Sequence, residues 1–182
     1  MSLRVSFELD ADDLKHFRLV MRDARRALAG KSPEEIIAAA DTLIRGIGAQ
    51  KAPSFVTDRV QKLDLLRRMI SDLDWRLPHG DTQRVLNALA YFVEPDDLIP
   101  DHIPGLGFLD DAIMIELLVR ELRHEIEAYR DFVEYRQREL RDSAGKGLKQ
   151  QEARLESRRK ELHARLSRRR ERDAAQAARI LE

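Results

Sequence analysis

The chain has 182 residues, of which 43% are hydrophobic and 36% charged, a balance typical of a folded helical protein and not of a disordered chain. Its 33 Lys and Arg residues equal its 33 Asp and Glu residues, so the net charge does not indicate a nucleic-acid partner. Because it has no cysteine, disulfides, thiolate metal sites and a cysteine nucleophile are excluded.

The first half of the chain predicts helices with recognisable N-terminal caps. Apolar side chains recur at three- and four-residue intervals in three segments, residues 10–30, 32–48 and 56–77. Asp10 can cap the first segment, and Ser32 and Glu35 have the spacing of a capping box around Pro33. We therefore expect three helices, with Trp75 near the end of the third as a packing anchor.

Two further helices are predicted on either side of a proline-rich connector. Asp81 can cap a helix over residues 81–93, and an apolar stripe predicts one long helix over residues 109–141. Prolines between these helices exclude a continuous helix, because each pushes the residue before it out of the helical region. The connector is too apolar for a solvated loop, so we expect it to pack against the body.

Residues 143–182 differ from the rest in charge. They hold 12 Lys and Arg residues against 6 Asp and Glu residues, and their leucine spacing gives only a weak coiled-coil signal. We predict an all-α protein, with a helical domain over residues 1–142 and a basic helical extension or tail over residues 143–182. No segment approaches the roughly 18 apolar residues of a membrane span, and no signal peptide is recognisable. We therefore expect a cytoplasmic protein, with peripheral membrane attachment left open.

The connector contains the most informative motif. Its prolines and aspartates, with neighbouring apolar residues, follow a specific pattern: Tyr91, Pro95, Asp97, Leu98, Ile99, Pro100, Asp101, Ile103, Pro104, Gly107, Asp110 and Asp111. This pattern resembles the signature of the YkvA family, a bacterial domain family of unknown function, and we place the resembling unit at about residues 84–122. The resemblance implies two helices that flank a proline-rich turn, in a family whose members often look membrane-associated. Glu94, Asp96 and His102 are more polar than is usual in that family, which argues against membrane insertion here.

Three interpretations of the aspartates are open: caps of local backbone donors, a metal site, and a surface for a protein partner. Asp97 and Asp101 can accept hydrogen bonds from backbone amides of the turn, while Asp110 and Asp111 can cap the following helix. Alternatively, these four carboxylates could hold Mg²⁺ or Mn²⁺, since hard cations prefer oxygen ligands. Capping is the interpretation we favour, and it needs no cofactor. No residues form a recognisable catalytic constellation.

The basic extension could bind an anionic partner, either RNA or anionic lipid. Its cations gather in two runs, Arg158, Arg159 and Lys160, then Arg168, Arg169 and Arg170. The alternatives are a solvated helix with interleaved acids, and a clasp in which the extension docks on the acidic connector of its own or a neighbouring subunit.

Our leading functional prediction is a non-enzymatic interaction protein that presents the acidic connector and the basic extension to protein partners or to another copy of itself. The first alternative is a metal-dependent hydrolase or phosphotransfer enzyme that uses the clustered aspartates. The second is an RNA- or ribosome-associated factor that works through the basic extension.

Overall fold

The computed structural model describes residues 8, 10–27, 31–48, 54–89, 91, 109–142 and 147–180. This part of the chain contains seven helices and no strand, so the all-α prediction is confirmed. The helices are α1 (Ala11–Ala27), α2 (Pro33–Gly48), α3 (Ser54–Ser71), α4 (His79–Leu89), α5 (Leu109–Glu121), α6 (Arg123–Asp142) and α7 (Leu148–Ile180).

The first two helices begin at the predicted caps. Asp10 Oδ1 accepts hydrogen bonds from the amides of Asp12 (2.8 Å) and Asp13 (2.9 Å), which satisfies donors that have no partner inside α1. At α2 the capping box is closed in both directions: Ser32 N donates to Glu35 Oε2 (2.7 Å), and Glu35 N donates to Ser32 Oγ (3.2 Å). The hydrogen bond from Ser32 N is the largest cause of a lowered pKa at Glu35.

The turn after α3 places Trp75 in the core. Asp72 follows the last residue of α3, and its Oδ1 accepts hydrogen bonds from the amides of Asp74 (3.0 Å) and Trp75 (3.1 Å). This side-chain turn replaces another turn of helix, so α3 ends at Ser71, earlier than the sequence predicted. Trp75 is fully buried, as expected of a packing anchor.

The predicted cap of α4 is wrong. The helix begins at His79 because the carbonyl of Pro78 accepts hydrogen bonds from the amides of Asp81 and Thr82, both at 2.9 Å. Asp81 consequently lies inside the first turn, where it is 6% exposed and its carboxylate is available to another helix.

The single helix predicted over residues 109–141 is two helices, α5 and α6, separated at Leu122. The hydrogen bonds from Leu122 N to the Leu118 carbonyl (2.9 Å) and from Ile126 N to the Leu122 carbonyl (3.0 Å) continue through the break. The side chain of Leu122 is fully buried, so the backbone adjusts locally while the apolar stripe stays in the core.

One hydrophobic core joins α2 to α7. Helix α3 lies at its centre and packs against α2, α4, α5 and α6. The residues of the core with no exposed surface include Leu63, Leu66, Met69, Trp75, Val85, Leu89, Met114, Ile115, Leu118, Leu122, Phe132 and Leu162. The basic extension therefore contributes to the same core, through Leu162 and Leu166 of α7.

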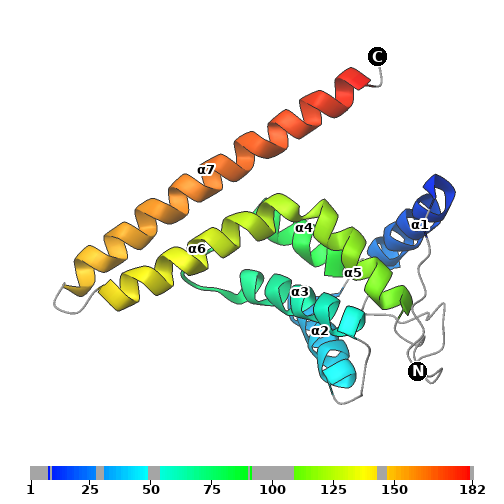
Figure 1. The fold of residues 1–182 in the computed structure, drawn as a ribbon, viewed down its shortest axis with the longest axis horizontal. Coiled ribbons are helices and arrows are strands. Elements are labelled where there is room, and N and C mark those ends of the chain that lie inside the picture. The colour runs from blue at the N-terminus through cyan, green and yellow to red at the C-terminus, as the bar shows by residue number, and fades with distance from the viewer. Residues whose placement is uncertain are drawn as a thin grey trace.

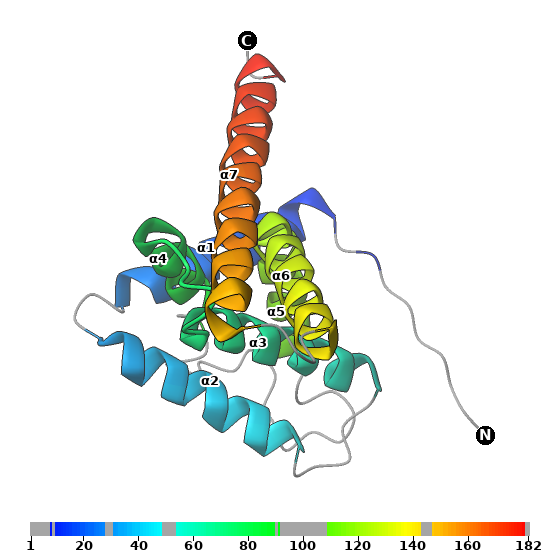
Figure 2. The same cartoon turned by 90° about the vertical axis from the view of Figure 1, so that its left-hand side faces the viewer.

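Helices α6 and α7 form a long antiparallel hairpin, the α6–α7 hairpin (Figure 1). Its closed end projects beyond the other helices on one side, and the C-terminal end of α7 rises away from the body on the other (Figures 1 and 2). Within the described ranges, no helix combines the length and apolarity required to cross a lipid bilayer.

Candidate functional site

The predicted aspartate site falls largely outside the described residues. Asp97 and Asp101 belong to residues 92–108, which lie outside them, and Asp110 and Asp111 are described only by their backbone, in the first turn of α5. Their capping and metal-binding roles therefore stay predictions. Elsewhere in the described chain, His, Asp and Glu residues do not gather in a group of three or more that could hold a metal.

A metal titration separates the two roles of the aspartates. We expect Mg²⁺ or Mn²⁺ added to chelator-treated protein to leave the melting temperature unchanged, because a capping carboxylate already has backbone donors as its partners. Asp110→Asn should then have the same effect with and without metal. A metal-dependent rise in melting temperature that Asp110→Asn abolishes would favour the metal site instead.

The best-defined polar site in the described chain is the contact between α6 and α7. A row of ion pairs crosses the α6–α7 hairpin: Arg154 with Glu139 (3.5 Å), Arg165 with Asp131, Arg169 with Glu127 (2.6 Å), and Asp173 with Arg123. In the last three, each step of four residues forward along α7 is matched by four residues back along α6, the register of antiparallel helices. His124 joins the last pair, with its Nε2 2.9 Å from Asp173 Oδ2.

A buried ionic cluster lies beneath this row of pairs, between α4, α6 and α7. The guanidinium of Arg170 pairs with Asp81, and lies 3.4 Å from Glu125 Oε1. Arg84 of α4 approaches the same Glu125 oxygen at 3.2 Å. Glu125 is only 1% exposed, and its Oε2 has no hydrogen-bond partner in the described structure. Since a buried carboxylate needs compensation, Arg170 is the residue that makes burial of both acids tolerable.

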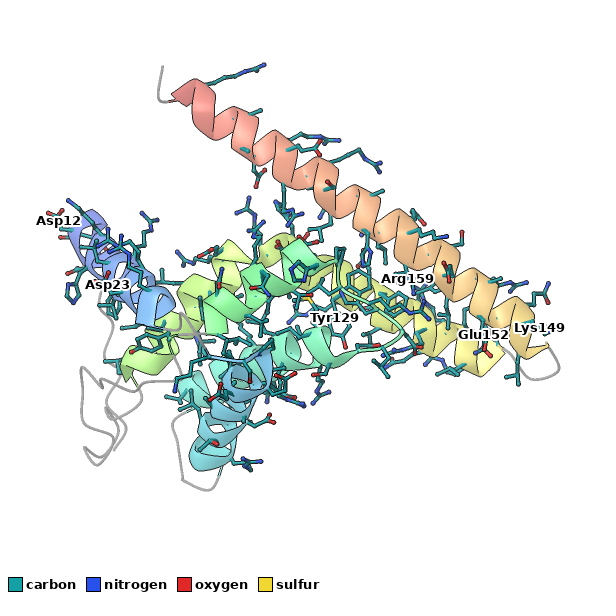
Figure 3. All side chains as sticks on the ribbon, turned by 180° about the vertical axis from the view of Figure 1, so that it is seen from behind. Asp12, Asp23, Tyr129, Lys149, Glu152 and Arg159 are labelled. Atoms are coloured by element: carbon teal, nitrogen blue, oxygen red, sulfur yellow. The ribbon has the colours of Figure 1, made fainter. Side chains whose placement is uncertain are left out.

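The turn after α3 binds α6 of the hairpin through two of its acidic residues. Tyr129 donates a hydrogen bond from its hydroxyl to Asp72 Oδ2 (2.9 Å), and Arg136 binds both Asp72 and Asp74 at 2.9 Å. Burial, reinforced by this bond to Asp72, raises the pKa of Tyr129 to about 12. Burial acts against the charge on Asp72, but hydrogen bonds from Arg136, the Trp75 amide and Tyr129 outweigh it and lower its pKa. Tyr129 and Arg159 are labelled in this region in Figure 3.

His163 of α7 rests on Trp75. The two rings meet edge to face, with centroids 4.3 Å apart, and His163 Nε2 is buried without a hydrogen-bond partner among the described residues. Burial lowers the pKa of His163 below its ordinary value of 6.5; Arg159 acts in the same direction and Asp81 opposes it. The imidazole is therefore held in its neutral form.

Acidification should accordingly loosen the contact of α7. The folded state binds a proton at His163 less readily than the unfolded state, so stability is complete above the ordinary pKa of 6.5 and falls as the pH drops below it. We expect the melting temperature of the wild type to fall between about pH 7.5 and 5, and that of His163→Leu to fall less. Identical pH profiles of the two proteins would contradict this role.

Most of the predicted partner-binding cations are engaged within the chain. Arg169 and Arg170 bind α6 and α4 as above, and Arg159 donates to the Asp74 carbonyl (3.3 Å). Arg158 pairs with Glu161 (2.8 Å) and lies over the Tyr135 ring, and Lys160 pairs with Glu156 (3.1 Å). Only Arg168 of the six is exposed without an ion-pair partner in the described chain.

Two further exposed cations were missed from the sequence, Arg172 and Arg179. They follow Arg168 by four and eleven residues, which places the three on one side of α7. Helical spacing is the signal that could have found them, because runs of adjacent arginines obscure which members share a face. We call Arg168, Arg172 and Arg179 the outer arginines.

A shallow hollow of about 480 Å³ lies between α3 and α6, lined by Asp58, Arg59, Gln61, Lys62, Leu65 and Arg130. Two of its cations are held by Glu116 of α5, at 2.9 Å from Lys62 and 3.5 Å from Arg59. The Lys62 hydrogen bond is the main cause of the lowered pKa of Glu116. This arrangement ties α3 to α5.

Comparison with known proteins assigns one segment of the chain to a protein family. Residues 84–117, from α4 through the connector into α5, match the model of DUF1232, a protein family of unknown function. The chain is also 39% identical over 62 residues to the uncharacterised membrane protein YkvA of Bacillus subtilis (strain 168), a match that covers 31% of this chain and 58% of the relative. The predicted YkvA-family segment is thus confirmed, while α6 and α7 lie outside the family match. No solved structure matches.

Proposed function

We propose that this protein is a non-enzymatic interaction protein that binds an acidic protein partner through the projecting end of α7. The observation that carries the proposal is the exposure of the outer arginines on a helix that continues past its last ion pair with the body, at Asp173. The docked side of α7 is neutralised by its own chain, whereas the outer arginines, towards its C-terminal end, are exposed cations available to another molecule.

A protein is favoured over RNA because α7 offers no aromatic platform. Its sequence contains no Phe, Tyr or Trp, and its one ring, His163, is covered by Trp75. Sequence-tolerant RNA binding usually depends on bases stacked on exposed rings. A straight helix with arginines on one side is better suited to the acidic side of another helix or loop.

Site-specific photocrosslinking in cells tests this proposal. A crosslinking amino acid at the exposed Ala175 lies on the same side as the outer arginines, and one at the exposed Gln137 of α6 serves as the control. We expect a protein adduct from position 175 alone, resistant to nuclease and lost when Arg168, Arg172 and Arg179 are all replaced by Glu.

Four outcomes would reject the acidic-protein partner. The first three are a nuclease-sensitive adduct, an adduct made only of two copies of this chain, and an adduct that survives the triple charge reversal. Equal adducts from positions 137 and 175 would show non-specific contact and reject it as well.

The Bacillus relative is described as a membrane protein. We extend that location to this chain as attachment to a membrane surface, not insertion of the connector. The support is the three polar departures from the family pattern, Glu94, Asp96 and His102, which raise the cost of placing the connector in hydrocarbon.

A further inference from the structure

Exposed leucines gather at one end of the molecule. In the described chain, four large hydrophobic side chains are exposed: Leu19 (38%), Leu73 (85%), Leu140 (62%) and Leu148 (75%). Leu140 lies in the last turn of α6, and Leu148 is the first residue of α7, so both belong to the closed end of the α6–α7 hairpin. Leu73 lies between Asp72 and Asp74, which both bind Arg136, one turn before Leu140.

The two hairpin leucines continue the apolar sides of their helices past the end of the body. Leu140 follows the partly buried Val133 by seven residues, and Leu148 precedes the partly buried Leu155 by seven, so each shares a helix side with a residue that packs on the core. The closed end of the hairpin projects beyond the other helices (Figure 1), and both leucine side chains are exposed there. Figure 3 places Lys149 and Glu152 at this end, far from Asp12 and Asp23.

Cations are close in sequence to the two hairpin leucines. Residues 138–149 contain Arg138, Arg141, Lys146 and Lys149 against two acids, Glu139 and Asp142. Glu139 is neutralised by Arg154, and Arg138, Arg141 and Lys149 are exposed. Exposed leucines with long cationic neighbours suit the boundary between acyl chains and anionic headgroups, because the leucines enter the apolar layer while the cations remain at the headgroups.

We infer that the closed end of the α6–α7 hairpin is a membrane anchor, in which Leu140 and Leu148 enter the surface layer of a bilayer rich in anionic lipid. The inference rests on the proposed membrane attachment and names the surface responsible for it. Both residues stand clear of the core, so this end can meet a flat surface without rearrangement of the bundle.

Vesicle sedimentation tests the anchor. Full-length protein is mixed with vesicles of phosphatidylglycerol and phosphatidylcholine, and with vesicles of phosphatidylcholine alone. We expect binding to the anionic vesicles, and a loss of about tenfold or more in affinity when Leu140 and Leu148 are both replaced by Ser, because two exposed apolar side chains are removed. Leu19→Ser, at a distant exposed leucine, is the matched control and should bind as the wild type does.

A fluorescent probe gives a second measurement. Because the chain has no cysteine, Leu148→Cys and Leu19→Cys each allow a single environment-sensitive label. We expect anionic vesicles to shift the emission of the label at position 148 to the blue and to leave the label at position 19 unchanged.

The outcomes separate the inference from the proposal on which it rests. If the wild type binds neither kind of vesicle, membrane attachment and anchor both fail. If the double Ser variant binds anionic vesicles as tightly as the wild type, attachment stands and the anchor is overturned. A concentration-dependent dimer that the double variant abolishes, without vesicle binding, would assign the leucines to a second copy and also overturn the anchor.

Discussion

Replacement of Arg170 by Met is expected to destabilise the protein by about 3–5 kcal/mol, because it removes one partner of a buried ionic cluster. Asp81 would keep no cationic partner in the described chain, and Glu125 would keep Arg84 alone. Chemical unfolding in urea, followed by circular dichroism, measures the effect. Arg168→Met, two residues earlier and exposed, is the control, with an expected change within about 0.5 kcal/mol.

A compensating variant shows whether the loss arises from uncompensated charge. Combining Arg170→Met with Asp81→Asn and Glu125→Gln removes the buried charges together, so we expect it to recover a large part of the lost stability. Equal effects of Arg170→Met and Arg168→Met would contradict the importance of the cluster.

Leu162→Ala should cost about 2–5 kcal/mol, the range for a fully buried leucine whose loss leaves a cavity. Among the described side chains of α7, Leu162 and Leu166 belong to the buried core, so their contacts hold the helix against the rest of the bundle. We therefore expect amide hydrogen exchange to accelerate more in α7 than in α3. Leu148→Ala, on the same helix but exposed, should leave both stability and exchange nearly unchanged.

The exchange pattern distinguishes a local effect from a global one. Uniform acceleration in α3 and α7 would mean that α7 opens only when the whole bundle unfolds. A larger effect in α7 would mean that it is a separate cooperative unit, docked on an otherwise folded core.

Local rules predicted the helices well because their determinants lie within a few residues. The caps at Asp10 and Ser32 depend on side chains that reach amides two or three positions away, and both form as predicted. The start of α4 was mispredicted because the carbonyl of Pro78 already supplies the acceptor at that helix end, and the Asp81 carboxylate pairs with Arg170 of α7. Arg170 lies 89 positions further along the chain, so no local sequence pattern contains this pair.

The polar site was harder to predict for a similar reason. When a helix carries charges on all sides, its sequence does not indicate which side packs against the rest of the protein. Both arginine runs of α7 were therefore predicted to be available to a partner. The complementary signal was present in α6, where Asp131, Glu127 and Arg123 recur at four-residue steps that match the opposite charges of α7 in antiparallel order. Its recognition would have required the two helices to be paired in advance.

The length of α7 has a mechanical consequence. A helix of 33 residues extends about 50 Å, and its docked half is braced by α6. The proposed lipid contact and the proposed protein contact lie near its opposite ends. The length of α7 would therefore set the distance between a bound protein and the bilayer. Removal of one helical turn would shorten that distance by about 5.4 Å.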